Sequence, residues 1–317
     1  MISIDDVERA AKTIAGRVHR TPLRRSATLS ERLNADAFLK AELFQRTGSF
    51  KVRGAINRLH ELTDEERARG VITISAGNHA QAVAWAARES GLDALVVMWQ
   101  GADESKVVAT RGYGAAVDQE AANPTDAFAR LDELLAETGR TLVHPFNDAA
   151  VIAGQGTVGL EILEDREVPD VVVVPVGGGG LISGIATVVK ARQPRARVIA
   201  VEPERSTALH DALAAGRSVP VTPRSAADAL SAPFAGEACV EICTTLGVES
   251  VLVTEDELAE AFRWLYARMK FAVELGAAAS TAALLADKVH VEPGQTVVAV
   301  VSGGNVAARE AAAILAP

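Results

Sequence analysis

The chain is poor in cysteine, in aromatic residues and in positive charge. Its 317 residues include two cysteines, 4% aromatic residues, and 32 Lys and Arg against 41 Asp and Glu. Two cysteines cannot build the disulfide framework of a small secreted domain. The formal charge of −9 would repel phosphate backbones and anionic membrane surfaces, so we expect no nucleic-acid partner.

Signals for export and for membrane insertion are also missing. No apolar run reaches the roughly 18 residues that span a bilayer, and the N-terminal sequence MISIDDVERAAKTI carries acids where a signal peptide needs basic residues. We therefore expect a cytoplasmic protein that is not bound to a membrane. Cys239 and Cys243 lie one helical turn apart and are interpreted as small buried residues, so no metal site is predicted there.

Hydrophobic residues make up 49% of the chain, and they alternate between two patterns. Short β-branched runs are followed by longer helical patterns such as Gln81–Ala87, Ala127–Leu135 and Ile185–Lys190. This alternation is typical of parallel sheets covered on both faces. The predicted class is α/β, with two doubly wound domains and mostly parallel sheets. The predicted strands are Val71–Ile74, Ala94–Met98, Val171–Val176, Val198–Val201, Val251–Val253 and Val297–Val301.

The predicted domain division follows from the rhythm of strands and helices alone. At roughly 100–200 residues per domain, the length favours two domains. One run of strands and helices extends from about Gly70 to His144, and another begins after the glycine-rich segment Ala153–Gly159. We predict a small domain at 69–146 and a large domain formed by 1–68 and 147–317.

The clearest motif is a buried strand that runs into four glycines, Gly177 to Gly180, and then a helix. Backbone N–H groups at such a turn can approach an anion closely, and the helix N-terminus adds partial positive charge. A phosphate group is the expected ligand. A tight turn is the alternative, but one or two glycines suffice for that. A dinucleotide loop would need G-x-G-x-x-G, whose third glycine is missing here.

Three shorter segments carry weaker signals. Lys51 begins a predicted helix after Gly48, Ser49 and Phe50, a setting that lowers the pKa of an amine, although a lone helix lysine is more often solvated. The segment 75–79, Ser-Ala-Gly-Asn-His, could bind a carboxylate or simply cap a helix. His79 could be a base, but a structural role is favoured. The segment 302–305 is either a third ligand loop or another glycine turn.

In combination, these four segments resemble the fold type II pyridoxal-phosphate enzymes, specifically the threonine/serine dehydratase and serine racemase group. The segments 144–148, His-Pro-Phe-Asn-Asp, and 153–159, Ala-Gly-Gln-Gly-Thr-Val-Gly, extend the resemblance over the whole chain. The resemblance implies α,β-elimination from a β-hydroxy amino acid, such as L-threonine or L-serine, to a 2-keto acid and ammonia. It also implies a homodimer and a small-molecule amino-acid substrate.

The resemblance also implies a role for each site residue. Lys51 would bind pyridoxal phosphate covalently and move the α-proton, and Phe50 would pack against the pyridine ring. Asn78 would bind the ring hydroxyl, and Ser302 would meet the pyridine nitrogen. The phosphate would lie on Gly177, Gly178, Gly179, Gly180 and the Leu181 amide, and the substrate carboxylate on Ser75, Ala76, Gly77, Asn78 and His79.

Two positions depart from the group's pattern. Racemases of the group have a second serine where this chain has Ala76, so racemisation is disfavoured. The group's divalent-cation site pairs a glutamate with an aspartate six residues later, whereas Glu202 is followed by Ala208. Losing a carboxylate weakens such a site, so we expect elimination without a divalent cation. An acid that simply ends a strand is the alternative explanation of Glu202.

Other functions stay open at this point. The substrate could be another hydroxy amino acid, such as phenylserine or hydroxyaspartate, and the pocket wall that decides this could include Phe146 and the segment 230–234, Leu-Ser-Ala-Pro-Phe. Serine racemase and a non-catalytic protein that binds pyridoxal phosphate are further alternatives. Phe146 favours an apolar β-substituent such as the methyl group of threonine.

Overall fold

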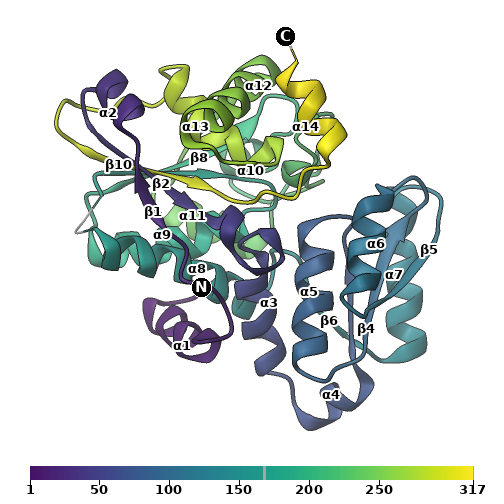
Figure 1. Cartoon of the computed structure of the whole chain (residues 1–317). Coiled ribbons are helices and arrows are strands. Elements are labelled where there is room, and N and C mark those ends of the chain that lie inside the picture. The colour runs from purple at the N-terminus through teal and green to yellow at the C-terminus, as the bar shows by residue number, and fades with distance from the viewer. Residues whose placement is uncertain (167–168, 317) are drawn as a thin grey trace.

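The computed structural model describes residues 1–166 and 169–316, which form two sheets with helices around them (Figure 1). The larger sheet has six strands in the order β1-β2-β10-β7-β8-β9, and the smaller has four in the order β5-β4-β3-β6. In the larger sheet the strands are β1 (Leu23–Arg25), β2 (Asp36–Ala41), β7 (Val171–Pro175), β8 (Arg197–Pro203), β9 (Glu249–Val253) and β10 (Thr296–Val301). In the smaller sheet they are β3 (Val71–Ile74), β4 (Ala94–Trp99), β5 (Ala116–Ala121) and β6 (Thr141–Leu142).

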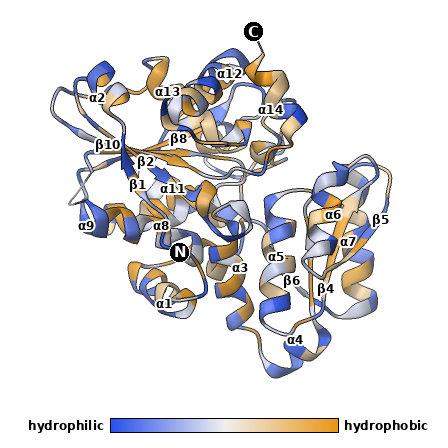
Figure 2. Ribbon diagram, in the orientation of Figure 1, coloured by the Kyte–Doolittle hydropathy of each residue, from blue (hydrophilic) through white to orange (hydrophobic). Residues whose placement is uncertain are grey.

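The strands pair in parallel, except that β1 is antiparallel to β2. Both faces of each sheet are buried. On β7, for example, Val171 and Val173 belong to one hydrophobic cluster and Val172 and Val174 to another. Figure 2 accordingly shows strands such as β4 and β8 as mainly hydrophobic. The predicted α/β class with mostly parallel sheets is confirmed.

Helices cover both sheets. Those beside the smaller sheet in the chain are α4 (Asp64–Arg69), α5 (Asn78–Glu89), α6 (Glu104–Gly112) and α7 (Pro124–Thr138), of which α5, α6 and α7 contact its strands. The remainder are α1 (Ile4–Ile14), α2 (Ala27–Leu33), α3 (Lys51–His60), α8 (Ala149–Asp165), α9 (Gly180–Arg192), α10 (Ala208–Ala215), α11 (Glu237–Thr245), α12 (Glu255–Trp264), α13 (Ala279–Leu285) and α14 (Ala308–Leu315). Within the described residues, no helix is both long enough and apolar enough to cross a membrane.

Every strand and helix predicted above is present, with ends that differ by a few residues. The sequence patterns missed β1, β2, β5 and β6, which are short or carry charged residues. The glycine-rich segment 153–159 was expected to separate two runs of strands and helices, but it lies inside α8. The strands of the smaller sheet follow one another between residues 71 and 142, and the predicted domain boundaries themselves stay predictions.

The glycines of α8 allow neighbouring helices to approach closely. A Cβ atom on Gly154 would lie 2.5 Å from the Cα atom of Gly54 in α3, and one on Gly184 in α9 would lie 2.5 Å from the backbone nitrogen of Gly156. These separations are too short for any side chain. The glycines of 153–159 therefore serve helix packing, and they hold α3 against α8.

We predict that Gly154→Ala destabilises the protein by about 1–3 kcal/mol, the usual cost of overpacking a well-packed core. Gly112→Ala is the matched control, because Gly112 is also helical and a Cβ atom there would meet nothing within 4 Å. The control should be neutral or stabilising by up to about 1 kcal/mol. Urea unfolding of both variants measures the difference, and equal stabilities would contradict this account of the packing.

Candidate active site

Ser75, Gly177 and Ser302 each follow the carboxyl end of a parallel strand, β3, β7 and β10 respectively. In open parallel sheets, ligands bind at these ends. Backbone contacts bring the lysine segment to the end of β10: Ser49 forms a bridge with Gly303, and the Phe50 N–H donates to the Ser302 carbonyl over 3.2 Å. Lys51 therefore begins α3 beside Ser302.

The Lys51 amine is held within the protein. Its Nζ atom donates to the Pro145 carbonyl over 2.8 Å and lies 5.2 Å from the centre of the Phe50 ring. Burial lowers the pKa of Lys51 to about 8, although Cys239 and Glu274 nearby favour the ammonium form. About a tenth of the amine is thus neutral at pH 7, far more than at the ordinary pKa of a lysine, and the neutral form is the one that attacks a carbonyl.

The glycine loop forms a cradle at the N-terminus of α9. Gly179 precedes the helix with a φ of +97° and no side chain caps it, so the first N–H groups of the helix lack a side-chain partner. A Cβ atom on Gly178 would lie 2.2 Å from the Phe146 ring, and one on Gly179 would lie 2.8 Å from the Cβ of Cys239. Gly179 is needed for its positive φ angle, and the other glycines are needed because a side chain would collide with its neighbours. This cradle fits a phosphate group.

The segment 75–79 is arranged differently from a capped helix. Gly77 is the residue before α5, and neither Ser75 nor Asn78 caps the helix with its side chain. Instead the Gly77 N–H donates to Ser75 Oγ over 3.1 Å. The helix-capping alternative is therefore wrong, and the N-terminus of α5 keeps donors that suit a carboxylate.

His79 is buried on the first turn of α5, and its Nε2 lies 2.9 Å from the Val143 carbonyl. Burial and the nearby positive charge of Lys51 lower the pKa of His79 to about 3. The ring is neutral at physiological pH and tied to the backbone, which supports the structural role favoured above.

Aromatic side chains from the two segments expected to line a pocket meet beside the glycine cradle. The Phe146 and Phe234 rings lie 5.5 Å apart, edge to face, and the His144 ring lies 4.7 Å from that of Phe146. Phe128 of α7 lies 6.4 Å from Phe234. These side chains form an apolar wall next to Gly178.

Glu202 lies near the end of β8 and is buried. Its carboxylate accepts the Leu209 and His210 N–H groups over 2.8 and 2.7 Å, so it binds the N-terminus of α10. Burial raises the pKa of Glu202 to about 8. In the part of the chain that the structure describes, no group of three His, Cys, Asp or Glu side chains could hold a metal ion.

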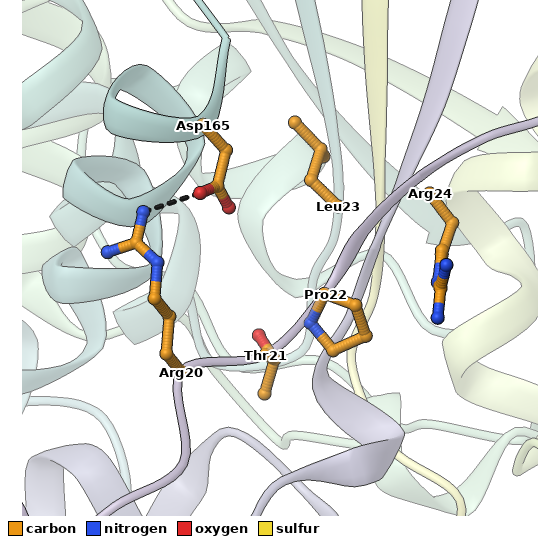
Figure 3. Close-up of a pocket in the computed structure, with 6 residues that line it drawn as sticks. All are labelled: Arg20, Thr21, Pro22, Leu23, Arg24 and Asp165. Carbon is orange, nitrogen blue, oxygen red and sulfur yellow. Dashed lines mark hydrogen bonds and ion pairs between the residues drawn. The ribbon is translucent and has the colours of Figure 1, made fainter.

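A buried network of ion pairs lies behind Lys51. Arg53, fully buried on α3, pairs with Glu42 over 2.8 Å and with Glu161 of α8 over 2.6 Å, and Lys40 of β2 also pairs with Glu161 over 2.6 Å. The Lys40 amine donates to the Thr21 carbonyl over 2.7 Å. Thr21 also lines a surface cavity at whose edge Arg20 pairs with Asp165, as Figure 3 shows.

Sequence reasoning missed two side chains of this site, Glu274 and Asn305. Glu274 accepts a hydrogen bond from Asn78 over 2.7 Å, and Asn305 donates one to Asn78 over 2.8 Å. Glu274 lies in an irregular segment far from any glycine motif, so no sequence pattern pointed to it. Asn305 ends the segment 302–305, and its place beside the glycines was the available signal.

Comparisons with known proteins agree on one family. The profile described as "Pyridoxal-phosphate dependent enzyme" matches residues 14–303. The chain is 43% identical to an L-threonine ammonia-lyase of Thermotoga maritima, over 96% of this chain and 76% of that protein. It is 42% identical to a catabolic L-threonine dehydratase of Escherichia coli, over 96% and 93%. The solved structure of maize serine racemase superposes with a TM-score of 0.93 at 36% identity, covering 97% and 94%.

We predict that pyridoxal phosphate followed by borohydride reduction labels Lys51. Because the pKa of Lys51 is lowered to about 8, the neutral amine increases as pH rises, and the initial labelling rate should be half-maximal near pH 8. Peptide mapping identifies the labelled site, and Lys51→Ala is the control that should carry no label. Labelling of Lys40 or Lys190 in its place would contradict the assignment.

Proposed function

The chain belongs to the pyridoxal-phosphate-dependent enzymes, and from this membership we propose that it is a threonine/serine ammonia-lyase. It eliminates water from a β-hydroxy amino acid, and hydrolysis of the released enamine yields a 2-keto acid and ammonia. The observation that carries the proposal is the desolvated Lys51 amine, beside the ends of strands that carry a phosphate cradle and a carboxylate loop.

Pyridoxal phosphate, when bound, supplies a ring that withdraws electrons from the substrate Cα. The neutral Lys51 amine accepts the α-proton, and Phe50 would pack against the ring. Asn78 would donate to the ring hydroxyl, and Ser302 would meet the ring nitrogen. Ser302 offers a neutral hydroxyl there and not a carboxylate, a setting that would favour rapid loss of a β-leaving group.

Backbone donors bind the two anionic groups in this proposal. The N–H groups of Gly177, Gly178, Gly179, Gly180 and Leu181 hold the phosphate. The substrate carboxylate lies on the segment formed by Ser75, Ala76, Gly77, Asn78 and His79. Both sites are supported by uncapped helix N-termini, whose free N–H groups favour negative charge.

L-Threonine is the preferred substrate in this proposal and L-serine the second. The apolar wall of Phe146 and Phe234 suits a β-methyl group, and two relatives are named for threonine. The larger phenylserine and the acidic hydroxyaspartate are the alternatives that a substrate panel decides. The protein acts in the cytoplasm as a homodimer, and light scattering tests the dimer.

We expect the protein to release 2-ketobutyrate from L-threonine and pyruvate from L-serine, with Lys51→Ala losing at least 10²-fold in kcat because the placed base is gone. A coupled assay for the keto acids measures both. Since the carboxylate position of the cation site holds Ala208, activity should survive exhaustive chelation. A protein that binds the cofactor but releases no keto acid from any hydroxy amino acid would be a binding protein and not a lyase.

We also predict that L-serine yields pyruvate with little D-serine. Lys51 serves one face of the substrate Cα, and Ala76 offers no acid or base on the other. An unplaced water donor forfeits the roughly 10²–10⁴-fold that a positioned acid supplies, so Ala76→Ser should raise racemisation relative to elimination. Chiral chromatography measures the ratio. Equal rates of racemisation and pyruvate release in the unmodified protein would refute the role given to Ala76.

A further inference from the structure

A chain of side-chain amides links the three loops at the site. The Asn305 Nδ2 donates to the Thr47 carbonyl over 2.7 Å and to the Asn78 Oδ1 over 2.8 Å. The Asn78 Nδ2 donates to the Glu274 Oε1 over 2.7 Å. This hydrogen-bonded chain therefore connects the loop before Lys51, the first residue of α5 and the loop after β10.

The order of donors along this chain fixes how each amide is turned. A backbone carbonyl only accepts, so the Thr47 oxygen requires the nitrogen of Asn305 to face it. That nitrogen has two hydrogens, and the Thr47 and Asn78 oxygens take both. The oxygen of Asn78 must then face Asn305, which turns the Asn78 nitrogen toward the Glu274 carboxylate. Among the described residues, the other amide hydrogen of Asn78 has no partner and is available to a ligand.

Glu274 and Asn305, at the two ends of this hydrogen-bonded chain, lie in tight surroundings. A Cβ atom on Gly303 would lie 2.2 Å from the Glu274 Oε1, and one on Gly48 would lie 2.2 Å from the Asn305 Oδ1. The Glu274 N–H donates to the Gly303 carbonyl over 3.2 Å, and the Glu274 side chain is buried. Neither end group can move far without displacing backbone.

We propose that Asn305 and Glu274 are positioning residues that hold the Asn78 amide so that its remaining hydrogen faces the ring hydroxyl of pyridoxal phosphate. A flipped Asn78 would place two nitrogens against each other and two oxygens against each other, and it would present an acceptor to the hydroxyl. The inference deepens the proposed function and rests on the cofactor role that it gives to Asn78.

The test is a double-mutant cycle on cofactor affinity. The Kd of the apoenzyme for pyridoxal phosphate is measured by fluorescence titration for the unmodified protein, Asn305→Ala, Asn78→Ala and the double variant. Loss of one net hydrogen bond corresponds to a Kd about 3- to 10-fold weaker for Asn305→Ala. Because Asn305 acts through Asn78, the same change in the Asn78→Ala background should alter the Kd less than about 2-fold.

Glu274 is tested with a conservative pair. Glu274→Gln keeps an acceptor oxygen and should bind the cofactor within about 2-fold of the unmodified protein, whereas Glu274→Leu removes the acceptor and should weaken binding about 3- to 10-fold. The absorption spectrum of the bound cofactor should shift in Asn305→Ala and Glu274→Leu and stay unchanged in Glu274→Gln. A loss in Glu274→Gln equal to that in Glu274→Leu would overturn the role of the acceptor.

A buried-amide control separates positioning from general loosening. Asn57 of α3 donates to the Ala150 carbonyl over 2.9 Å and contacts none of the chain's members by hydrogen bond among the described residues. Asn57→Ala should leave the Kd unchanged. Additive losses in both Asn78 backgrounds, or an equal loss in Asn57→Ala, overturn the inference alone. Failure of the unmodified apoenzyme to bind the cofactor at Lys51 would overturn the proposed function itself.

Discussion

The geometry of the site depends on the buried ion pairs of Arg53, two residues after Lys51. Arg53 and Lys40 face Glu42 and Glu161, so two positive and two negative groups neutralise each other inside the protein. Breaking one buried pair leaves an uncompensated charge and typically costs about 3–5 kcal/mol. The network therefore fixes the first turn of α3 relative to β2 and α8, and with it the position of Lys51.

Glycine packing and the ion pairs act on the same helix from different sides. Gly54 allows α8 to approach α3 next to Arg53. Glu161 lies about two turns after Gly154 on α8 and pairs with Arg53 there. A side chain at Gly54 or Gly154 would move α3 away from Glu161. Because the two constraints share α3, the packing of the core and the placement of the reactive amine cannot vary independently.

Two buried groups near the reactive amine have pKa values shifted in opposite directions. His79 is kept neutral by burial, with its pKa lowered to about 3, while burial raises the pKa of Glu274 to about 7. The anion sites consist of backbone N–H groups at the starts of α5 and α9. Fixed dipoles of this kind bind a phosphate and a carboxylate without adding further acids or bases that could compete with Lys51.

The α/β class, the central strands and the segments expected to bind ligands could be predicted from the sequence, because buried parallel strands are continuous apolar runs and glycine loops are local. Local patterns could not reveal β1 or β2, nor the helical state of 153–159, whose glycines have meaning only against Gly54 and Gly184. Folding alone brought Glu274 and Asn305 to Asn78 and gave the Glu202 carboxylate its backbone partners on α10. Those contacts link residues up to 227 positions apart, and the chemistry of a single carboxylate or amide depends on the partners that folding brings to it.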